Sequence, residues 1–327
     1  MRLQEEFWKK LLAELSTGNR VVLLYVIDSS GSSPGRQGFK MLVSESGFLW
    51  GSIGGGIMEF KLVEWCKETL LKAEFAPFIK RQIHQGGIKE NKSGMICSGE
   101  QTIAFYSLTQ EAVPLVASIL KAVTTHTYGL LQLTEVGIDF QSKHTAPQQF
   151  HLALTHDGKW NCIEDIGFQP QLLIVGGGHV GLALSTIGKQ LGFAITVFDD
   201  RDDLNTIELN QSARFVKVSD YTEIDQYIPT GDHHYVVLMS FGYRTDKVIL
   251  KRLIGKTFRY LGMMGSKEKV KTLFQELEQE GIARHLIDQV YSPIGVQIYS
   301  KTPEEIAISI LAELIKVKNS PSASVDL

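Results

Sequence analysis

Cysteine is scarce in this sequence, and that scarcity excludes two kinds of protein. The 327 residues include three cysteines, Cys66, Cys97 and Cys162, and no two of them are close together. A small disulfide scaffold and a zinc cluster built from two close cysteine pairs both need more. So low a cysteine content suits the reducing environment of the cytoplasm.

Long apolar runs and an excess of charge of one sign are also missing. No stretch reaches about 18 consecutive apolar residues, so the sequence predicts no membrane span. The opening MRLQEEFWKK is charged and amphipathic and lacks the apolar core of a signal peptide. The net charge is −3, and no basic run offers a surface for nucleic acid. We therefore expect a soluble, cytoplasmic protein without nucleic-acid or membrane partners.

The composition is that of an ordinary globular protein with room for two domains. Hydrophobic residues make up 43% of the chain, and the length fits two domains of about 100–200 residues. The first part mixes helices with short strands, and residues 111–168 predict one helix and two strands. Asp157-Gly158 within that stretch is typical of a tight hairpin turn.

Strands and helices alternate after Pro170, which is typical of a doubly wound parallel sheet. We therefore predict an α/β fold with a mixed α/β N-terminal domain over residues 1–168. A Rossmann-like C-terminal domain follows over residues 169–317, and its last helix begins with a capping box at Thr302. The polar residues 318–327 predict a disordered tail.

The segment LLIVGGGHVG carries the spacing of a dinucleotide-binding turn. Gly176, Gly178 and Gly181 directly follow an apolar strand, and the next strand ends in Asp199, 23 residues after the first of these glycines. Such glycines allow a tight turn, close approach of a pyrophosphate and close packing of helix on strand. Asp199 is then expected to accept from ribose hydroxyls, and His179 either touches a phosphate or faces solvent.

Two interpretations of this turn stay open: it binds NAD or another nucleotide, or it persists only as architecture. In the first case Asp199 would favour NAD over NADP, and Arg201 would soften that preference to about tenfold. Lys267 and Lys269 near a predicted helix start indicate either a bound anion or a solvated basic turn. The pair His233-His234 is interpreted as the lead-in to a strand, since no third metal ligand is identifiable.

The N-terminal half holds a second glycine cluster. Gly54, Gly55 and Gly56, followed by Glu59, are more than a strand-to-helix turn needs, so they indicate either close approach of a ligand or a purely structural turn. Cys97 precedes Ser-Gly in a polar loop, where a thiolate would serve as a soft metal ligand or nucleophile; the alternative is an inert buried thiol. Cys66 shares a helix face with leucines and is expected in the core.

Taken together, these motifs resemble the XdhC/CoxI-type accessory proteins of xanthine dehydrogenase and related molybdenum hydroxylases. The motifs are GSSPGRQGFKMLV, GSIGGGIME, the lone cysteine before a glycine-containing loop, LLIVGGGHVG with VFDDR, YLGMMGSKEK, and SPIG with KTPEEIAISILAE. The resemblance covers nearly the whole chain and includes both domains in the expected order.

The resemblance implies a maturation factor and not a metabolic enzyme. Such proteins bind molybdenum cofactor (molybdopterin), support its sulfuration with a partner sulfurtransferase, deliver it to an apo-dehydrogenase, and are typically dimeric. Carried over residue by residue, the cofactor-binding positions include Gly54, Gly55, Gly56 and Glu59, and Cys97 is the sulfur that would contact the metal.

The sequence departs from the family pattern at two places. The family often has a cysteine directly after the glycine triplet, where this chain has Ile57, and it often reads Cys-Gly-Gly, where this chain has Cys97-Ser98-Gly99. The resemblance therefore leaves Cys97 as the sole candidate thiol. The competing interpretations are an NAD(P)-dependent oxidoreductase, opposed by the lack of a visible catalytic base, and a nucleotide-sensing protein without chemistry.

Overall fold

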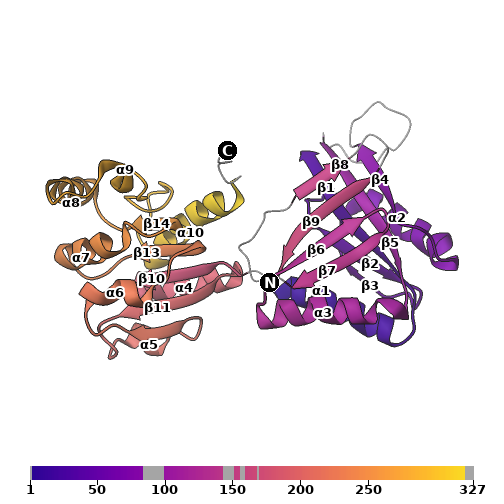
Figure 1. Ribbon diagram of the computed structural model, residues 1–327, viewed down its shortest axis with the longest axis horizontal. Coiled ribbons are helices and arrows are strands. Elements are labelled where there is room, and N and C mark those ends of the chain that lie inside the picture. Colours follow the sequence, from indigo (N-terminus) through magenta and orange to yellow (C-terminus); the bar gives the residue numbers. More distant parts are fainter. Residues whose placement is uncertain (1, 84–98, 143–150, 155–158, 168, 321–327) are drawn as a thin grey trace. The chain divides into compact units, whose positions relative to one another are not determined.

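The computed structural model describes residues 2–83, 99–142, 151–154, 159–167 and 169–320, and the chain divides into two units (Figure 1). The first unit spans Met1–Phe168 and the second Gln169–Leu327. In these ranges no helix is both long and apolar enough to cross a bilayer.

The N-terminal unit begins with a five-stranded antiparallel sheet in the order β3-β2-β1-β5-β4. Its central strand β1 is buried on both faces over residues 21–27, as a continuous run of β-branched and aliphatic residues requires. The strands are β1 (Val21–Gly31), β2 (Lys40–Ser44), β3 (Leu49–Gly51), β4 (Phe78–Ile83) and β5 (Gly99–Leu108).

A second antiparallel sheet, in the order β7-β6-β9-β8, packs on one face of the first (Figure 1). Leu23 and Tyr25 from the first sheet meet Leu131, Trp160 and Cys162 from the second in the shared core. The strands are β6 (Gly129–Thr134), β7 (Gly137–Ser142), β8 (His151–Leu154) and β9 (Trp160–Ile166).

Helices complete both sides of this arrangement. α1 and α3 add their apolar faces to the core between the sheets, and α2 covers the other face of the first sheet through Met58, Leu62 and Cys66. The elements are α1 (Arg2–Ser16), α2 (Gly56–Glu68), η1 (Leu70–Lys72), η2 (Gln110–Ala112) and α3 (Val113–Thr125).

The described parts of residues 111–168 hold four strands, so the prediction of two strands was wrong. The side chains of β7 are partly or fully exposed, so the strand lacks the alternation of apolar and polar residues that marks a half-buried strand. β8 and β9 pair as antiparallel strands, whereas the turn predicted at Asp157-Gly158 lies outside the described residues.

The C-terminal unit is a five-stranded parallel sheet with helices on both faces (Figure 1), which confirms the predicted Rossmann-like class. The strand order is β12-β11-β10-β13-β14, so the first strand of the unit lies at the centre. The strands are β10 (Gln171–Val175), β11 (Ala194–Asp199), β12 (Arg214–Lys217), β13 (Gly231–Leu238) and β14 (Phe258–Met263).

The two faces of this sheet carry different helices. α4 and α10 cover one face through Leu184 and Leu311, and α7, α8 and α9 cover the other through Ile249, Leu273 and Ile287. The helices are α4 (His179–Gln190), α5 (Asn205–Glu208), η3 (Tyr221–Glu223), α6 (Ile224–Tyr227), α7 (Tyr243–Leu253), α8 (Lys267–Gln279), α9 (Arg284–Ile287) and α10 (Pro303–Asn319).

The last helix begins as its sequence predicts. Thr302 accepts from the backbone N–H of Glu305, and the Glu305 carboxylate accepts from the backbone N–H of Thr302, which completes the capping box. α10 continues to Asn319, two residues beyond the expected end of the domain. Of the predicted disordered tail, residues 321–327 lie outside the described residues.

Candidate functional site

A crevice of about 630 Å³ opens at the carboxyl ends of the parallel strands in the C-terminal unit. It lies where β11 and β13 diverge to opposite sides of β10, which is where ligands bind in open α/β sheets. Its volume is within the range of about 300–1,000 Å³ typical of small-molecule sites. The lining residues are Gly178, His179, Val180, Gly181, Arg201, Asp203, Leu204, Asn205, Thr206, Met239, Ser240, Phe241 and Met264.

The three glycines of the fingerprint have different surroundings. Gly176 has a φ of +125°, and a Cβ there would lie 2.4 Å from the carbonyl oxygen of Met239. A Cβ at Gly181 would lie 2.4 Å from the carbonyl oxygen of Gly176. At Gly178 no described atom lies within 4 Å of the Cβ position. Gly176 and Gly181 are thus required by packing, whereas Gly178 leaves the turn open toward the crevice.

The helix start beyond this turn is suited to an anion. Gly178 is the N-cap residue of α4 and supplies no side chain to the first N–H groups of the helix. Those groups, together with the helix dipole, favour a phosphate or carboxylate. His179 is the first helical residue, is exposed, and lines the crevice. The structure therefore brings the predicted residues Gly178 and His179 to one open helix N-terminus.

Asp199, predicted to accept from ribose, is instead fully engaged by the protein. Its side chain is 0% exposed. One oxygen accepts from the Gly177 backbone N–H at 2.6 Å and from Arg201 Nη2 at 3.0 Å. The other accepts from Arg201 Nε at 2.9 Å and from the Arg201 backbone N–H at 3.0 Å. Ribose recognition by Asp199 stays a prediction, and in this structure Asp199 fixes the glycine turn and the Arg201 guanidinium.

The same contacts keep Asp199 ionised. Burial alone would raise the pKa of this carboxyl, but the hydrogen bonds from Arg201 and from the Gly177 backbone outweigh burial and hold the pKa below its ordinary value. The Arg201 pKa is raised in turn, chiefly by its hydrogen bond with Asp199. Both groups therefore stay charged throughout the neutral range.

Two further candidates from the sequence are engaged in contacts of their own. The Lys269 ammonium pairs with the buried Asp246 carboxylate at 2.6 Å, and Ser240 donates to the other oxygen of Asp246. His234 is buried, and its Nδ1 lies 2.8 Å from the Pro229 carbonyl oxygen. No group of three His, Cys, Asp or Glu side chains in the described ranges is arranged to hold a metal ion.

The glycine cluster of the N-terminal unit forms a tight turn before α2. Gly54, Gly55 and Gly56 have φ values of +127°, +72° and +71°. A Cβ at Gly54 would lie 2.6 Å from the Gly35 nitrogen, whereas the Cβ position of Gly55 has no described atom within 4 Å. The neighbouring loop therefore excludes a side chain at Gly54, whereas a side chain at Gly55 would meet no described atom.

Glu59 organises this turn. One carboxylate oxygen accepts from Ser52 Oγ at 2.7 Å, from the Ile53 backbone N–H at 2.8 Å and from the Gly55 backbone N–H at 3.0 Å. The bond to Gly55 satisfies the backbone N–H of the N-cap residue of α2, and the bonds to Ser52 and Ile53 fix the chain just before it. Glu59 thus holds the turn in place through hydrogen bonds. Ile57, which stands where the family often has a cysteine, is 53% exposed in the first turn of α2.

Gln101 is a residue that the sequence interpretation missed. It is buried on β5, where its side-chain oxygen accepts from Ser33 Oγ at 2.8 Å and from the Gly35 backbone N–H at 3.0 Å. Its side-chain nitrogen donates to the Ile53 carbonyl oxygen at 3.1 Å. Gln101 thus joins the loop after β1 to the glycine turn. Ser33 and Gln101 are 68 residues apart in sequence, so no local sequence pattern predicts their contact.

The cysteines fall into two groups. Cys66 on α2 is buried, which confirms its predicted place in the core, and burial raises its pKa to about 12. Cys162 is buried between the two sheets, and burial raises its pKa to about 12 as well. Neither thiol is suited to bind a metal, since that needs an accessible thiolate. Cys97, the predicted sulfur and metal ligand, lies outside the described residues.

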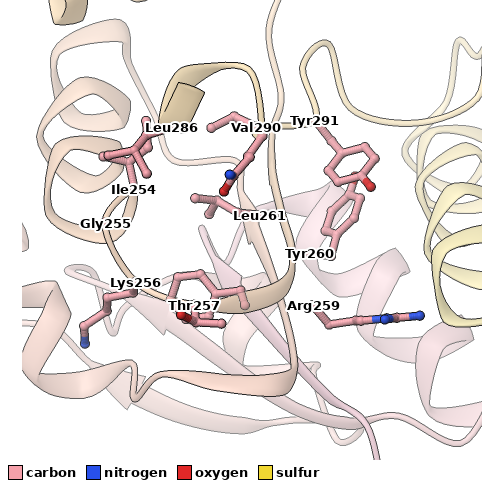
Figure 2. Close-up of a pocket in the computed structure, with 12 residues that line it drawn as sticks. Ile254, Gly255, Lys256, Thr257, Arg259, Tyr260, Leu261, Leu286, Val290 and Tyr291 are labelled. Carbon is pink, nitrogen blue, oxygen red and sulfur yellow. The ribbon is translucent and has the colours of Figure 1, made fainter. Parts of the chain in front are cut away.

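A second, smaller recess of about 190 Å³ lies beside the amino end of β14 (Figure 2). Figure 2 shows the Tyr260 and Tyr291 rings side by side near Arg259, and the ring centroids are 4.4 Å apart. Because ligands of open α/β sheets bind at the opposite, carboxyl ends of the strands, the crevice at the glycine turn is the better candidate site.

The strand order, the glycine turn and the open crevice define a Rossmann-type α/β domain joined to a β-rich N-terminal unit. Residues 172–314 match the XdhC Rossmann domain, and residues 15–79 match the XdhC and CoxI family. The chain belongs to the XdhC/CoxI family, and this result confirms the resemblance found in its motifs.

Three relatives align with most of this chain. YqeB of Escherichia coli is 26% identical over 296 residues, which is 90% of this chain but 43% of that protein. A protein of Bacillus subtilis named as a probable xanthine dehydrogenase component is 25% identical, and the alignment covers 95% of this chain and 97% of that protein. The molybdenum cofactor insertion chaperone PaoD of Escherichia coli is 24% identical, covering 93% of this chain and 85% of its own length.

The fold also occurs in a crystal structure. A xanthine dehydrogenase from Bacillus halodurans superimposes with a TM-score of 0.71 at 22% identity and covers 98% of both chains. At this level of identity the likeness establishes the shared fold.

Proposed function

We propose that this protein is an accessory factor that binds molybdenum cofactor as cargo and supports its sulfuration and insertion into a xanthine dehydrogenase-like hydroxylase. The observation that carries the proposal is that both units of the chain match the family. The open crevice at Gly178 gives this chain a place to bind a ligand. The name of the relative PaoD, a molybdenum cofactor insertion chaperone, supports it.

The crevice fits such a cargo. Molybdopterin carries a phosphate and a flat, polar heterocycle. The free N–H groups at the start of α4 would take the phosphate, and about 630 Å³ of volume would admit the ring system. Asn205 lines the crevice and supplies a side-chain amide, and the Ser240 hydroxyl, which donates its proton to Asp246, can accept a further hydrogen bond. The protein's part is to hold and orient the cargo and to restrict its contact with water.

Within the N-terminal unit, the glycine turn is the proposed contact for the cofactor or for a client. The open position at Gly55 supports this role, because a partner backbone or ligand can approach it closely. Cys97 is the proposed sulfur ligand, since Cys66 and Cys162 are buried. A sulfurtransferase partner, a homodimer and a cytoplasmic location belong to the same proposal.

The rival function is that of an NAD(P)-dependent oxidoreductase or a nucleotide sensor, for which the Rossmann crevice is the supporting observation. The described crevice offers His179 as a titratable imidazole, but no carboxylate or second histidine among its lining residues is hydrogen-bonded to it as a proton relay. Storage and delivery of cargo need no such relay.

The experiment that tests the proposal is purification of the full chain from a molybdenum-replete host. Metal analysis and pterin fluorescence of the released cofactor should show molybdenum and pterin in comparable amounts. Cys97→Ser should lower pterin retention while the melting temperature stays near that of the wild type. Bound NAD without pterin would contradict the cargo role. Unchanged pterin retention in Cys97→Ser would contradict the role of the Cys97 thiol.

A further inference from the structure

Three carboxylates follow the one that ends β11, and they differ in what they contact. Asp200 accepts from the Tyr221 hydroxyl at 3.3 Å, and Asp202 pairs with Lys217 at 2.6 Å. Asp203 has no hydrogen-bond or ion-pair partner within the described residues, and it lines the crevice. It is therefore the carboxylate of this loop that remains available to a ligand.

Asp199 cannot take that role without a rearrangement. A ligand that reached its oxygens would have to displace the Arg201 guanidinium, which makes two hydrogen bonds to them. It would also have to share an oxygen with the Gly177 backbone N–H. Breaking a buried, hydrogen-bonded ion pair costs more than a ligand hydrogen bond returns.

The opposite wall of the crevice presents an aromatic ring. Phe241 follows β13, lines the crevice and is 87% exposed. Asp203 follows β11, and β10 with its glycine turn lies between these two strands. A large ring so exposed at the mouth of a site is suited to stack on a planar heterocycle.

We propose that Asp203 is the carboxylate by which the crevice recognises its ligand, and that the ligand is a phosphorylated heterocycle with two adjacent hydrogen-bond donors. The phosphate lies at the start of α4, the donors point to Asp203, and Phe241 contacts the ring. The inference rests on the proposed function, because it names the chemistry by which the cargo is recognised. Two sources of paired donors fit: the amino-pyrimidinone edge of a pterin or guanine, and a ribose diol.

The charges of the crevice also predict which ligands it excludes. The Arg201 charge is neutralised by its pairing with Asp199, whereas the Asp203 charge has no protein partner in the described structure. If the ribose diol is the source of the donors, a phosphate on the ribose 2′-oxygen would lie against Asp203 and be repelled. In that case NAD should bind better than NADP by more than the tenfold that an unpaired Arg201 would allow.

The test is calorimetric titration of the full chain with matched ligand pairs. GMP and IMP differ by the 2-amino group of the base, and AMP and 2′,3′-dideoxy-AMP differ by the ribose diol. In the wild type, one pair should differ by about tenfold in affinity. That pair identifies the source of the donors. Asp203→Asn should abolish the difference, and the adjacent control Asp202→Asn should preserve it.

The outcomes separate this inference from the proposed function. Equal discrimination in Asp203→Asn and wild type, or no binding of any of the four ligands at millimolar concentration, would overturn the inference. Pterin retention is measured on the same preparations. If the wild type retains pterin while Asp203→Asn discriminates normally, the inference alone fails. If no preparation retains pterin while discrimination depends on Asp203, the cargo proposal fails and the crevice is a nucleotide site.

Discussion

Nζ of Lys40 lies 3.5 Å from a side-chain carboxyl oxygen of Glu164 in the N-terminal unit, where β2 faces β9. The Tyr25 hydroxyl donates to Glu164 and accepts from Lys40 at 2.7 Å. Both charged side chains are largely buried, and burial disfavours each charge. Burial raises the pKa of Glu164 to about 8 and lowers the pKa of Lys40 to about 7.

This pair makes stability depend on pH. Since the Glu164 pKa is raised from 4.5 to about 8, the folded state binds an extra proton between these values. The stabilisation is full below the lower value and is lost as the pH rises through about 8. The free energy of unfolding of the wild type, measured relative to that of Glu164→Gln, should therefore fall as the pH rises from 5 toward 8.

Lys40→Met provides the opposite control, because the Lys40 pKa is lowered from 10.5 to about 7. Its stabilising contribution is present at high pH and is lost as the pH falls toward about 7. Urea unfolding of the three proteins at several pH values measures both trends. Parallel pH profiles for wild type and variants would show that the pair does not titrate in this range.

Gly54→Ala and Gly55→Ala should differ sharply although the positions are adjacent. Both have positive φ, which costs an alanine about 1–2 kcal/mol. Only at Gly54 would the new Cβ also meet the backbone of the loop at Gly35. We expect a much larger loss of melting temperature for Gly54→Ala, and a loss of client or cargo binding for bulkier side chains at Gly55. Equal melting temperatures would contradict the close contact with that loop.

Gly178→Val and Gly181→Val should separate binding from folding. The Cβ position of Gly178 is open and its φ is −69°, so valine there should fold and block the approach of a phosphate. Valine at Gly181 would collide with the Gly176 carbonyl oxygen and destabilise the unit. Thermal unfolding and ligand titration of both variants measure the two effects. Wild-type affinity in a folded Gly178→Val protein would place the ligand elsewhere.

Cys66→Ser should lower the free energy of unfolding by about 1–3 kcal/mol, since a hydroxyl would be buried where the thiol packs on the sheet. Cys66→Ala leaves no unsatisfied polar group and should cost less. Denaturant unfolding of the two variants gives the comparison. Pterin retention should follow the folded fraction in both, because this thiol is buried.

The C-terminal fold could be predicted from sequence because its signals are local. The glycine spacing, the strand before it and the capping box at Thr302 each lie within one turn or helix start. Lys40 and Glu164 are 124 residues apart in sequence, and their pairing depends on how the two sheets pack. The spacing of apolar residues along each strand therefore cannot predict it. The engagement of Asp199 by Arg201 is a matter of side-chain conformation, which spacing alone cannot distinguish from ribose binding.

The way in which the backbone of Gly177 is held has a kinetic consequence. Asp199 accepts from the Gly177 N–H, and Thr206 donates to the Gly177 carbonyl oxygen, so side chains hold both backbone polar groups of this residue. A turn fixed in this way needs no ordering when a ligand binds, so binding there costs no backbone entropy at this residue. Binding of a ligand at this turn is then expected to follow a single exponential phase without a conformational lag, which stopped-flow titration would measure.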